Sequence, residues 1–578
     1  MSKQQGSESG VSGSQFIKEE EMAEEKEAPK RVSRREFVKG AAVGGAGVAA
    51  AGALASCAPA AAPAPTTAPE AAATTAPAAA PTPEPEKWDY DVDVVVAGSG
   101  NGGTSAFLSA ADAGAKSLLI EVSGVTGGST LFSGGYLHTA GQRTWEDYNA
   151  YTRGLHDPVL AKVFVETFWN EYVPWLESKG AYMSKNPETE DRAYYAKDYS
   201  FGKGEPPYRS HRLYFDSLIE AAQELGGTTM TKTSALKLHA DDEGRVIGLQ
   251  ARVWANSPLE EDQTLINIRA KKVILATGNF YGNKELLTRY ISPHGYRGLS
   301  YGGPYQSGEG IPMAQAVGAK MSRYLSTWSG GVNVITPVKQ WGDDPEGYEQ
   351  WLSVTEPEEY GAQYGKGRLS APFSISGAGA TAILVNLDGK RFMDESNPDD
   401  AQRRQMFFVL QQPQGEAWVI GDQKAYDASD ASESRINAIV DAGGNVMTAD
   451  TIEELADQLK AVGMYRADFL GTIAQYNQAI DSGTTTQLDP QRSEQETYWQ
   501  IDTPPFYAVP VTASFYYTAG GLEINQDAQT LDFQLRPIPN LYSPPPLGGG
   551  IMNQVYTGGV AIAGTFGYRA GQHAAANL

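Results

Sequence analysis

The stretch between Asp91 and Gly135 constrains the fold of this chain more than any other part of the sequence. It begins with an apolar, β-branched run, Val92 to Val96, which is typical of a strand buried in a parallel sheet. Gly98, Gly100 and Gly103 follow at once and form the pattern G-x-G-x-x-G. The sequence therefore predicts a buried strand that ends at a tight, glycine-rich turn.

The residues after this turn complete the pattern of a dinucleotide site. Residues 104–114 carry apolar residues at helical spacing, and a second strand over 117–122 ends in an acid, Glu121. The first glycine allows the turn, the second lets the backbone reach the pyrophosphate, and the third lets helix and strand pack closely. The helix N-terminus faces the phosphate charge, and an acid about 20 residues further on binds the ribose hydroxyls. An ordinary glycine-rich turn is the alternative, but strand, helix and acid together favour a nucleotide site.

Composition excludes several classes of partner and cofactor. The chain has 578 residues, enough for two or three domains, and a formal net charge of −23. We expect no nucleic-acid partner, since phosphate binding needs clustered lysine and arginine. The single cysteine, Cys57, excludes an internal disulfide, iron–sulfur ligation and c-type haem attachment, all of which need more thiols. No metal site is predicted.

The first 57 residues have the features of an export signal. Ser33 to Lys39, SRREFVK, resembles a twin-arginine signal, and the weakly apolar run from Gly40 to Ser56 is too short for a membrane span of about 20 residues. Leu54 to Cys57 resembles a lipoprotein lipobox, which would make Cys57 the acylated first residue of the mature protein. The alternative is a plain signal peptide with Cys57 incidental.

Residues 58–87 are almost entirely alanine, proline, threonine and glutamate, a composition typical of an extended, semi-rigid tether. The twin-arginine route carries proteins that are already folded, which suits a chain that takes up its cofactor before export. We therefore expect a lipid-anchored protein on the extracytoplasmic face of the cell membrane.

Motifs in a fixed order indicate a family. The hexapeptide at 98–103, Gly127 to Thr130 (GGST) and Ser133 to Gly135 (SGG) together resemble flavoproteins that include fumarate reductases, urocanate reductase and 3-ketosteroid Δ1-dehydrogenases. Turn punctuation is the alternative for the glycine pairs. Further segments are in the same order: KKVILATG ending at 278, SGEG at 307–310, the G-K-R-F segment at 389–392, Thr518 to Leu522, and the C-terminal Thr565 to Gly571. The resemblance spans about Asp91 to the C-terminus.

The resemblance implies an α/β fold and the cofactor FAD. A Rossmann-like FAD-binding domain would be built from both ends of the chain, 88–320 and 501–578, with an α+β cap (substrate) domain, 321–500, inserted between them. A small hairpin is predicted over 231–254, with its turn at 241–244. The residues that the resemblance assigns to FAD are Gly98, Ser99, Gly100, Asn101, Gly102, Gly103, Glu121, Val122, Gly128, Ser129, Thr130, Ser133, Gly134, Gly135, Ala235, Ala276, Thr277, Gly278, Asn283, Glu309, Tyr542 and Ser543.

The cationic positions of the family's dicarboxylate reductases differ in this chain. Those enzymes protonate the substrate with one arginine and hold its charges with a histidine and a second arginine. The matching positions here are, in that order, Asp399, the pair Tyr516 and Tyr517, and Tyr556. Arg403 and Arg404 lie close in sequence to the first and could substitute. A buried dianion without positive partners costs several kcal/mol per charge. Fumarate is therefore a disfavoured substrate.

Tyrosine suits a different substrate. A phenol with a pKa near 10 donates a hydrogen bond to a ketone and polarises it. Tyr556, followed by an F-G-Y segment at 566–568, resembles the ketosteroid dehydrogenases, although Val560 stands where that family has an assisting glycine. Tyr516 and Tyr517 are further candidates, with packing as the alternative because the chain has 30 tyrosines. His138 is a candidate for the substrate pocket, with a surface position as the alternative.

The predicted function is hydride transfer between FAD and the activated C=C or CH–CH bond of a small molecule, a neutral or mono-anionic enone or ketone. A urocanate- or other enoate-type reductase is the alternative within enzymes. A solute-binding lipoprotein and a flavoprotein that has lost catalysis are the alternatives outside them. Electrons would be exchanged with a quinone or a separate electron-transfer protein, because no haem motif is present.

Overall fold

The computed structural model describes residues 84–185, 192–194, 208–255, 263–300, 302–328, 332–337, 369–375, 379–397, 404–493, 499–553 and 555–578. They belong to one unit, Thr75–Leu578. The predicted export signal with Cys57, and the tether as far as residue 83, lie outside the described residues, as do Asp399 and Arg403. Within the described ranges, no helix combines the length and apolar character that crossing a bilayer requires.

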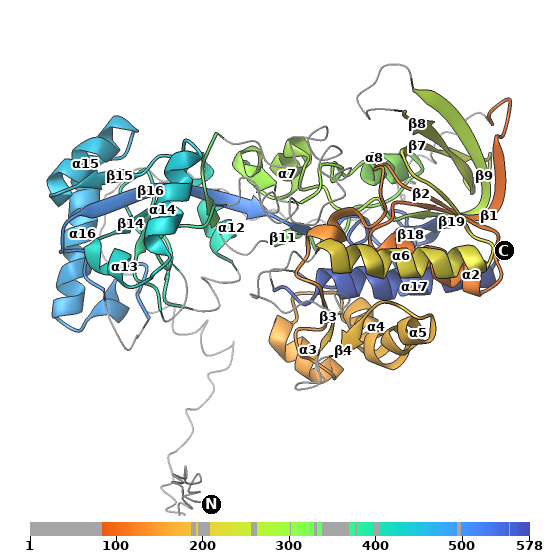
Figure 1. The fold of residues 1–578 in the computed structure, drawn as a ribbon, viewed down its shortest axis with the longest axis horizontal. Coiled ribbons are helices and arrows are strands. Elements are labelled where there is room, and N and C mark those ends of the chain that lie inside the picture. Colours follow the sequence, from red (N-terminus) through yellow and green to blue (C-terminus); the bar gives the residue numbers. More distant parts are fainter. Residues whose placement is uncertain are drawn as a thin grey trace, which may run out of the picture. The chain divides into compact units, whose positions relative to one another are not determined.

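A parallel sheet forms the centre of the first domain (Figure 1). Its parallel strands, in spatial order, are β6 (Thr228–Met230), β2 (Ser117–Ile120), β1 (Tyr90–Ala97), β9 (Thr264–Leu275) and β19 (Pro537–Tyr542). An antiparallel edge strand, β18 (Gln529–Leu531), pairs with β19. Val94, Val95 and Val96 of β1 are fully buried, because helices and hairpin cover both faces. The predicted α/β fold is confirmed.

Helices from both ends of the chain pack on this sheet (Figure 1). α2 (Asn101–Asp112) contacts α6 (Tyr208–Glu224) and α17 (Gly559–Ala576). The contact between α2 and α17 is close because a Cβ on Gly567 would collide with the carbonyl oxygen of Gly102. Ser109 reinforces it, since its hydroxyl donates to the carbonyl of Tyr568 at 3.0 Å. The C-terminal helix is therefore an integral part of the nucleotide domain.

The hairpin predicted over 231–254 is confirmed. It consists of β7 (Thr233–Ala240) and β8 (Val246–Val253), and β8 continues the main sheet by pairing antiparallel with β9. The Asp241 carboxylate holds the turn by accepting the backbone N–H of Arg245 at 2.8 Å.

A helical segment and a small sheet lie between the opening strands and α6. The helices are α3 (Trp145–Thr152), α4 (Pro158–Thr167), the π-helical turn η2 (Phe168–Tyr172) and α5 (Val173–Ser178). The strands are β3 (Tyr136–His138), β4 (Ser184–Lys185) and β5 (Arg192–Tyr194). Short helices η1 (Gly128–Phe132), α7 (Lys284–Tyr290) and α8 (Gly310–Ala316) follow the carboxyl ends of the main strands or their loops.

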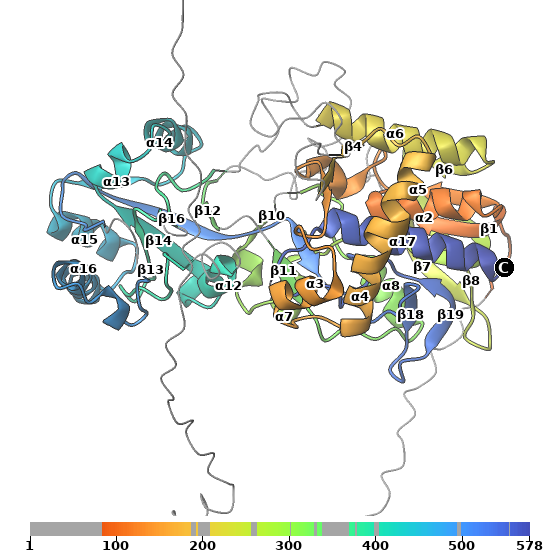
Figure 2. The same cartoon turned by 90° about the horizontal axis from the view of Figure 1, so that it is seen from below.

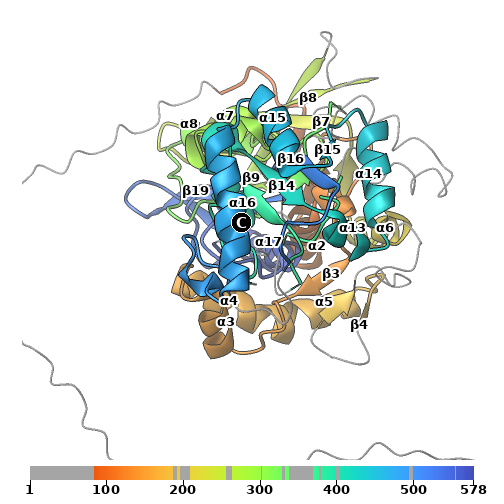
Figure 3. The same ribbon diagram turned by 90° about the vertical axis from the view of Figure 1, so that its left-hand side faces the viewer.

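A second sheet forms the cap, which we define as its strands β12 to β16 with the helices α12 to α16. The strands are β12 (Val332–Val334), β13 (Ile383–Val385), β14 (Glu416–Gly421), β15 (Met447–Ala449) and β16 (Phe506–Phe515). The helices are α12 (Gln405–Leu410), α13 (Gln423–Asp427), α14 (Ser432–Asp441), α15 (Ile452–Ala461) and α16 (Arg466–Asp481). Thr451 and Glu454 form a capping box at the predicted helix start before α15. Figure 3 shows α15 and α16 in front of β14 and β16, where Leu455, Phe469 and Trp418 share one apolar core.

β16 carries the chain from the cap back to the nucleotide domain (Figure 2). It pairs with β14 and β15, and its last residues, Ser514 and Phe515, pair with β10 (Leu299–Ser300). The next strand, β17 (Tyr517–Ala519), pairs with β11 (Ser326–Trp328). The chain therefore passes from the cap sheet to the nucleotide domain within β16 and β17. The predicted domain boundary between residues 500 and 501 stays a prediction.

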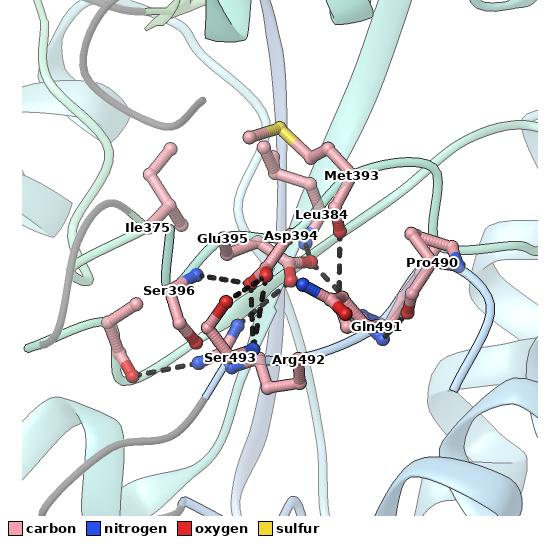
Figure 4. A network of polar contacts seen from close by, with 12 residues as sticks. Ile375, Leu384, Met393, Asp394, Glu395, Ser396, Pro490, Gln491, Arg492 and Ser493 are labelled. Carbon is pink, nitrogen blue, oxygen red and sulfur yellow. Dashed lines mark hydrogen bonds and ion pairs between the residues drawn. The ribbon is translucent and has the colours of Figure 1, made fainter. Parts of the chain in front are cut away.

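A buried ion cluster closes the cap around the G-K-R-F segment (Figure 4). Glu395 is fully buried and accepts from Arg391 Nη2 at 2.6 Å and from Arg492 Nη1 at 2.9 Å. Its second oxygen accepts the backbone N–H of Leu384 at 3.0 Å. Arg391 Nη1 in turn donates to the carbonyl of Pro490 at 3.0 Å. The cluster therefore ties β13 and its hairpin to the segment that precedes β16.

Candidate active site

A cavity of ≈ 640 Å³ opens at the carboxyl ends of β1 and β9, where connections leave the sheet in opposite directions. Open α/β sheets bind their ligands at this topological switch point. Of the residues predicted for the site, those that line the cavity are Gly98, Ser99, Gly100, Asn101, Gly102, Glu121, Val122, Gly128, Ser129, Thr130, Ser133, Gly134, His138, Ala235, Ala276, Thr277, Gly278, Glu309, Tyr516, Tyr517, Tyr556 and Val560. The structure therefore gathers nearly the whole predicted set around one space.

The three glycines of the motif are required for three different reasons. Gly98 has φ +100° and lies against the backbone of Ala276, so a side chain there would be strained and would collide. Gly103 touches the carbonyl of Gly98, which lets α2 begin directly beneath the turn. Gly100 has open space on its Cβ side, with Thr130 Oγ1 at 3.8 Å as the nearest atom. Its backbone can thus approach a ligand closely, as the dinucleotide motif requires.

Glu121 stabilises this turn from the end of β2. Its Oε2 accepts from the backbone N–H of Ser99 at 2.8 Å and from Ser99 Oγ at 2.6 Å, while Oε1 accepts the N–H of Ser123 at 2.9 Å. Ser99 Oγ also accepts the N–H of Gly127 at 2.9 Å. One carboxylate therefore holds β1, β2 and the GGST segment together at the cavity wall.

Asn101 occupies the first residue of α2, and its amide connects three helical segments. Nδ2 donates to the carbonyl of Val560 at 2.8 Å and to the Tyr172 hydroxyl at 3.1 Å. Oδ1 accepts from the Tyr214 hydroxyl at 2.9 Å. The residue thus fixes the start of α17, and Val560 takes part in the site through its backbone carbonyl.

The residues present fit a dinucleotide cofactor. Thr277 Oγ1 is buried, lines the cavity and has no hydrogen-bond partner among the described residues, so a polar ligand would satisfy it. The first turn of α2 carries no acidic residue, which leaves the positive end of the helix dipole facing the cavity. The chain thus offers backbone N–H groups, an open glycine and a hydroxyl donor for a pyrophosphate.

Five residues of the predicted set lie outside the cavity lining. Asn283 caps α7, accepting the N–H of Leu286 at 3.0 Å, and the Tyr542 hydroxyl pairs with His573 Nδ1 at 2.9 Å. Ser543 Oγ pairs with Thr530 Oγ1 at 2.8 Å. The remaining two are Gly103, beneath the turn, and Gly135. The contacts of Asn283, Tyr542, Ser543 and Gly103 place these four in the supporting structure around the cavity.

Several residues of the cavity lie outside the predicted set. Gln306 Oε1 accepts the N–H of Asn279 at 2.8 Å and touches Gly278, so it holds the turn after β9. Asn279 Oδ1 accepts the N–H of Thr518 at 2.7 Å, which links this turn to β17. The only sequence signal was the presence of amides just after ATG and just before SGEG. Other unpredicted lining residues with polar side chains are Ser123, Tyr136, Thr233, Ser234, Tyr281 and Tyr305.

Tyrosines and one histidine form the end of the cavity beside α17. The rings of Tyr517 and Tyr556 meet edge to face with centroids 6.3 Å apart, and His138 lies 6.0 Å from Tyr556. Burial raises the pKa of Tyr556 to about 12, and burial also raises the pKa of Tyr517 well above its ordinary value. Both phenols are therefore neutral hydrogen-bond donors at physiological pH. Gly559 is required beneath Tyr517, since a Cβ there would lie 2.6 Å from the ring.

No lysine or arginine is found among the described residues that line the cavity. The charged side chains there are Glu121 and Glu309, both in the nucleotide-binding part. Arg404, which the sequence analysis considered as a replacement cation, lies outside the lining with its guanidinium 5.9 Å from the Phe408 ring centroid. Across the same described ranges, no cluster of His, Cys, Asp and Glu could hold a metal ion. The described lining thus offers no lysine or arginine to pair with the carboxylates of a dianionic substrate.

Comparisons with known proteins agree with this geometry. A family profile described as FAD binding domain matches residues 93–339 and 367–559. A probable fumarate reductase of Shewanella frigidimarina is 28% identical over 497 residues, covering 82% of this chain and 73% of that protein. A vinyl phenol reductase of Lactiplantibacillus plantarum is 25% identical over 518 residues, covering 82% of this chain and 94% of that protein. The structure of a 3-ketosteroid Δ1-dehydrogenase from Sterolibacterium denitrificans shares the fold, with a TM-score of 0.61, 19% identity, and coverage of 84% of this chain and all of that one.

Proposed function

The chain belongs to the FAD binding domain family of oxidoreductases, and from that premise we propose that it acts on the activated C=C or CH–CH bond of a neutral or mono-anionic enone or ketone. The predictions of an FAD cofactor and of an oxidoreductase that acts on such bonds are confirmed by the family match. FAD, when bound, supplies hydride transfer, and the protein supplies binding, orientation and control of protons. The substrate class goes beyond the family match and is what we propose.

The charge of the cavity lining carries this proposal. Beside the phenols of Tyr517 and Tyr556, the described lining contains no lysine or arginine. A buried carboxylate without a paired cation costs several kcal/mol in lost hydration, and a dicarboxylate would incur that cost twice. A ketone needs only a hydrogen-bond donor. The lining therefore favours a substrate with an oxygen to polarise and at most one charge.

The two phenols have defined tasks in this reaction. Their pKa values are raised by burial, so each keeps its proton and donates to the substrate oxygen rather than acting as a base. Negative charge accumulates on that oxygen when the conjugated carbon gains hydride or, in the dehydrogenation direction, when the carbon next to the carbonyl loses its proton. A fixed donor stabilises that charge without reorganising. Their edge-to-face packing restricts both rings, which keeps the donors in place.

A reductase of an enoate or of a vinyl-substituted phenol is the second candidate. The similarity to a vinyl phenol reductase extends over 94% of that protein. The vinyl phenol in that protein's name is a neutral molecule, which the described lining would accept for the same reason as a ketone. A urocanate-type substrate remains within this candidate because it carries a single carboxylate.

We further propose that the protein works on the extracytoplasmic face of the cell membrane, anchored by a lipid on Cys57. SRREFVK at 33–39 and LASC at 54–57 support this proposal. Electrons would then be exchanged with a membrane quinone or a separate redox protein, since the single cysteine rules out an iron–sulfur cluster or a c-type haem in this chain.

Reoxidation of the reduced flavin tests the substrate class. The full-length holoprotein is reduced anaerobically, and fumarate, urocanate, cinnamate, 4-vinylphenol and 1,4-androstadiene-3,17-dione are added separately while the flavin absorbance is followed. We expect fast reoxidation by the dienone, or by 4-vinylphenol if the second candidate holds. Reoxidation by fumarate at a comparable rate would contradict the charge argument, and a preparation without flavin would contradict the whole proposal.

A further inference from the structure

The turn that follows β3 has a backbone conformation that the function proposed above leaves unexplained. Gln142 N–H donates to the carbonyl of Thr139 at 3.1 Å, and the two central residues, Ala140 and Gly141, have φ values of 55° and 79°. Positive φ at both positions is the pattern of a type I′ turn, for which glycine, asparagine and aspartate are the usual residues. Alanine at the first position is therefore strained, and strain that persists is concentrated at functional sites.

This conformation directs a backbone donor at a side chain. The N–H of Ala140 lies 2.9 Å from Nδ1 of His138. A backbone N–H only donates, so Nδ1 must accept and carries no proton. In a neutral imidazole the remaining proton is then on Nε2. Protonation of Nδ1 would break this hydrogen bond and place two donors against each other, so the turn favours the neutral ring.

Neighbouring groups hold the turn in place. Gln142 Nε2 donates to the carbonyl of Ala140 at 3.0 Å, and Trp169 Nε1 donates to Thr139 Oγ1 at 3.1 Å. Thr139 Oγ1 also donates to the carbonyl of Gln142. The tautomer of His138 is thus set by a braced backbone rather than by a side chain that can rotate.

His138 lies where such a donor would be useful. It ends β3, lines the cavity and packs 6.0 Å from the Tyr556 ring, measured between centroids. Gly558, with φ +104°, lies against the His138 carbonyl, and a Cβ there would collide with it. The segment that carries Tyr556 and the strand that carries His138 are therefore fitted to each other.

We propose that His138 is a neutral hydrogen-bond donor, through Nε2–H, to the ketone or phenol oxygen of the substrate, and that Ala140 is the positioning residue that fixes this tautomer. The inference rests on the proposed function, because it assumes a substrate oxygen at this end of the cavity. His138 keeps its proton throughout; it polarises the oxygen together with Tyr556 and transfers nothing. This donor role narrows the substrate class to activated alkenes that carry a neutral oxygen able to accept the hydrogen bond from Nε2–H.

The tautomer is measured directly on the full-length, flavin-loaded protein by ¹⁵N NMR with labelled histidine side chains. The chain has six histidines, and the resonances that disappear in His138→Gln assign His138. We expect an unprotonated Nδ1 and a protonated Nε2 at pH 7, retained in Ala140→Gly, which keeps the N–H and tolerates positive φ. Ala140→Val, which does not tolerate it, should lose the single tautomer. An Nδ1–H or a cationic ring in the parent protein would overturn the inference.

A pair of substitutions separates the two ring nitrogens in catalysis. The amide nitrogen of glutamine reaches about as far as Nε2, and that of asparagine only as far as Nδ1. With 1,4-androstadiene-3,17-dione or 4-vinylphenol as acceptor, we expect His138→Gln to keep kcat within about tenfold and His138→Asn to lose about 10²-fold, the effect of removing one oxyanion donor. Equal rates in both variants, or the reverse order, would overturn the donor role.

Binding without turnover distinguishes failure of this inference from failure of the proposed function. If neither acceptor reoxidises the parent flavin, the proposed function fails. 4-Ethylphenol, which has no vinyl group to reduce, is then added until the flavin absorbance stops changing. A shift of the His138 Nε2–H resonance, absent from the other five histidines, supports the donor role. No shift of that resonance at saturation, or no binding of the phenol, overturns it.

Discussion

Replacing Glu395 by glutamine removes the negative charge that Arg391 and Arg492 share. All three side chains are buried, with exposed fractions of 0% for Glu395, 5% for Arg391 and 0% for Arg492. Removing one member of a buried ion pair costs about 3–5 kcal/mol, because the remaining charge stays buried without its partner. Here two arginines lose their common partner, and the acceptor of the hydrogen bonds at 2.6 and 2.9 Å loses its negative charge.

The chain provides a matched control on α7. Glu285 and Arg289 form the same i, i+4 pair, but their side chains are 73% and 58% exposed. Exposed pairs of this kind contribute about 0.3–0.5 kcal/mol. Glu285→Gln makes the same side-chain change, so the difference between the two variants reports what burial and the second arginine add to the effect.

Hydrogen exchange followed by mass spectrometry is the suitable assay, because a chain with several sheets need not unfold in one step. We expect peptides from 383–395 and 485–493 to exchange at least about 100-fold faster in Glu395→Gln, as a loss of about 3 kcal/mol implies. Peptides from β1 and α2 should be unchanged. If the cap peptides of Glu395→Gln exchange no faster than those of Glu285→Gln, the reasoning from burial is refuted.

The remaining predictions concern pH, catalysis, the cofactor and the anchor. Burial alone would raise the pKa of Glu395, but Arg391 and Arg492 outweigh burial and lower that pKa below the ordinary 4.5. The stabilisation by this carboxylate is therefore present above pH 4.5 and lost on further acidification. Protection of the cap peptides from exchange should be constant from pH 7 to 5 and decline below 4.5, except in Glu395→Gln. Tyr556→Phe should lower kcat with the dienone about 10²–10³-fold and leave the bound flavin unchanged. Tyr568→Phe, outside the cavity lining, should leave kcat unchanged. Equal kcat values in the two variants would show that the Tyr556 phenol is not a donor to the substrate. Gly100→Ala should fold with normal exchange, because the added Cβ meets no protein atom closer than 3.8 Å. It should release flavin on gel filtration, because Gly100 lines the cavity; retained flavin would contradict the assigned phosphate approach. Cys57→Ala should move the protein from the membrane to the soluble fraction of fractionated cells, and a variant that still sediments with membranes would refute lipid anchoring at Cys57.

The nucleotide site could be predicted because its elements are adjacent in sequence. β1, the glycine turn, α2, β2 and Glu121 form one continuous segment, and the reason for each glycine follows from local backbone geometry. The hairpin β7–β8 and the start of α15 could be predicted for the same reason, since turn and cap residues act on their immediate neighbours. The family resemblance then supplied the return of the C-terminal segment to the same domain.

Local pattern was a poorer guide where a side chain can turn to several partners. Asn283, Tyr542 and Ser543 match family positions, yet their polar groups bond to a helix end, to His573 and to Thr530. Gln306 and Asn279, which the sequence analysis passed over, hold the turn after β9. Which of these polar groups reaches the cavity depends on how strands and helices are placed, and spacing along the chain does not encode that.

The sequence by itself determined that this protein has a buried strand, a glycine-rich turn and an acid arranged to bind a dinucleotide, because steric limits on the backbone act between near neighbours. Only the tertiary structure decided which side chains from distant segments share the cavity with that cofactor site. His138 comes from the small sheet, Tyr517 from the strand after the cap, and Tyr556 from the segment before α17. They share one cavity because α17 packs on α2 and β16 leads the chain back to the nucleotide domain. Those long-range contacts arise from burial of apolar surface, which is non-directional and depends on how all the elements pack together.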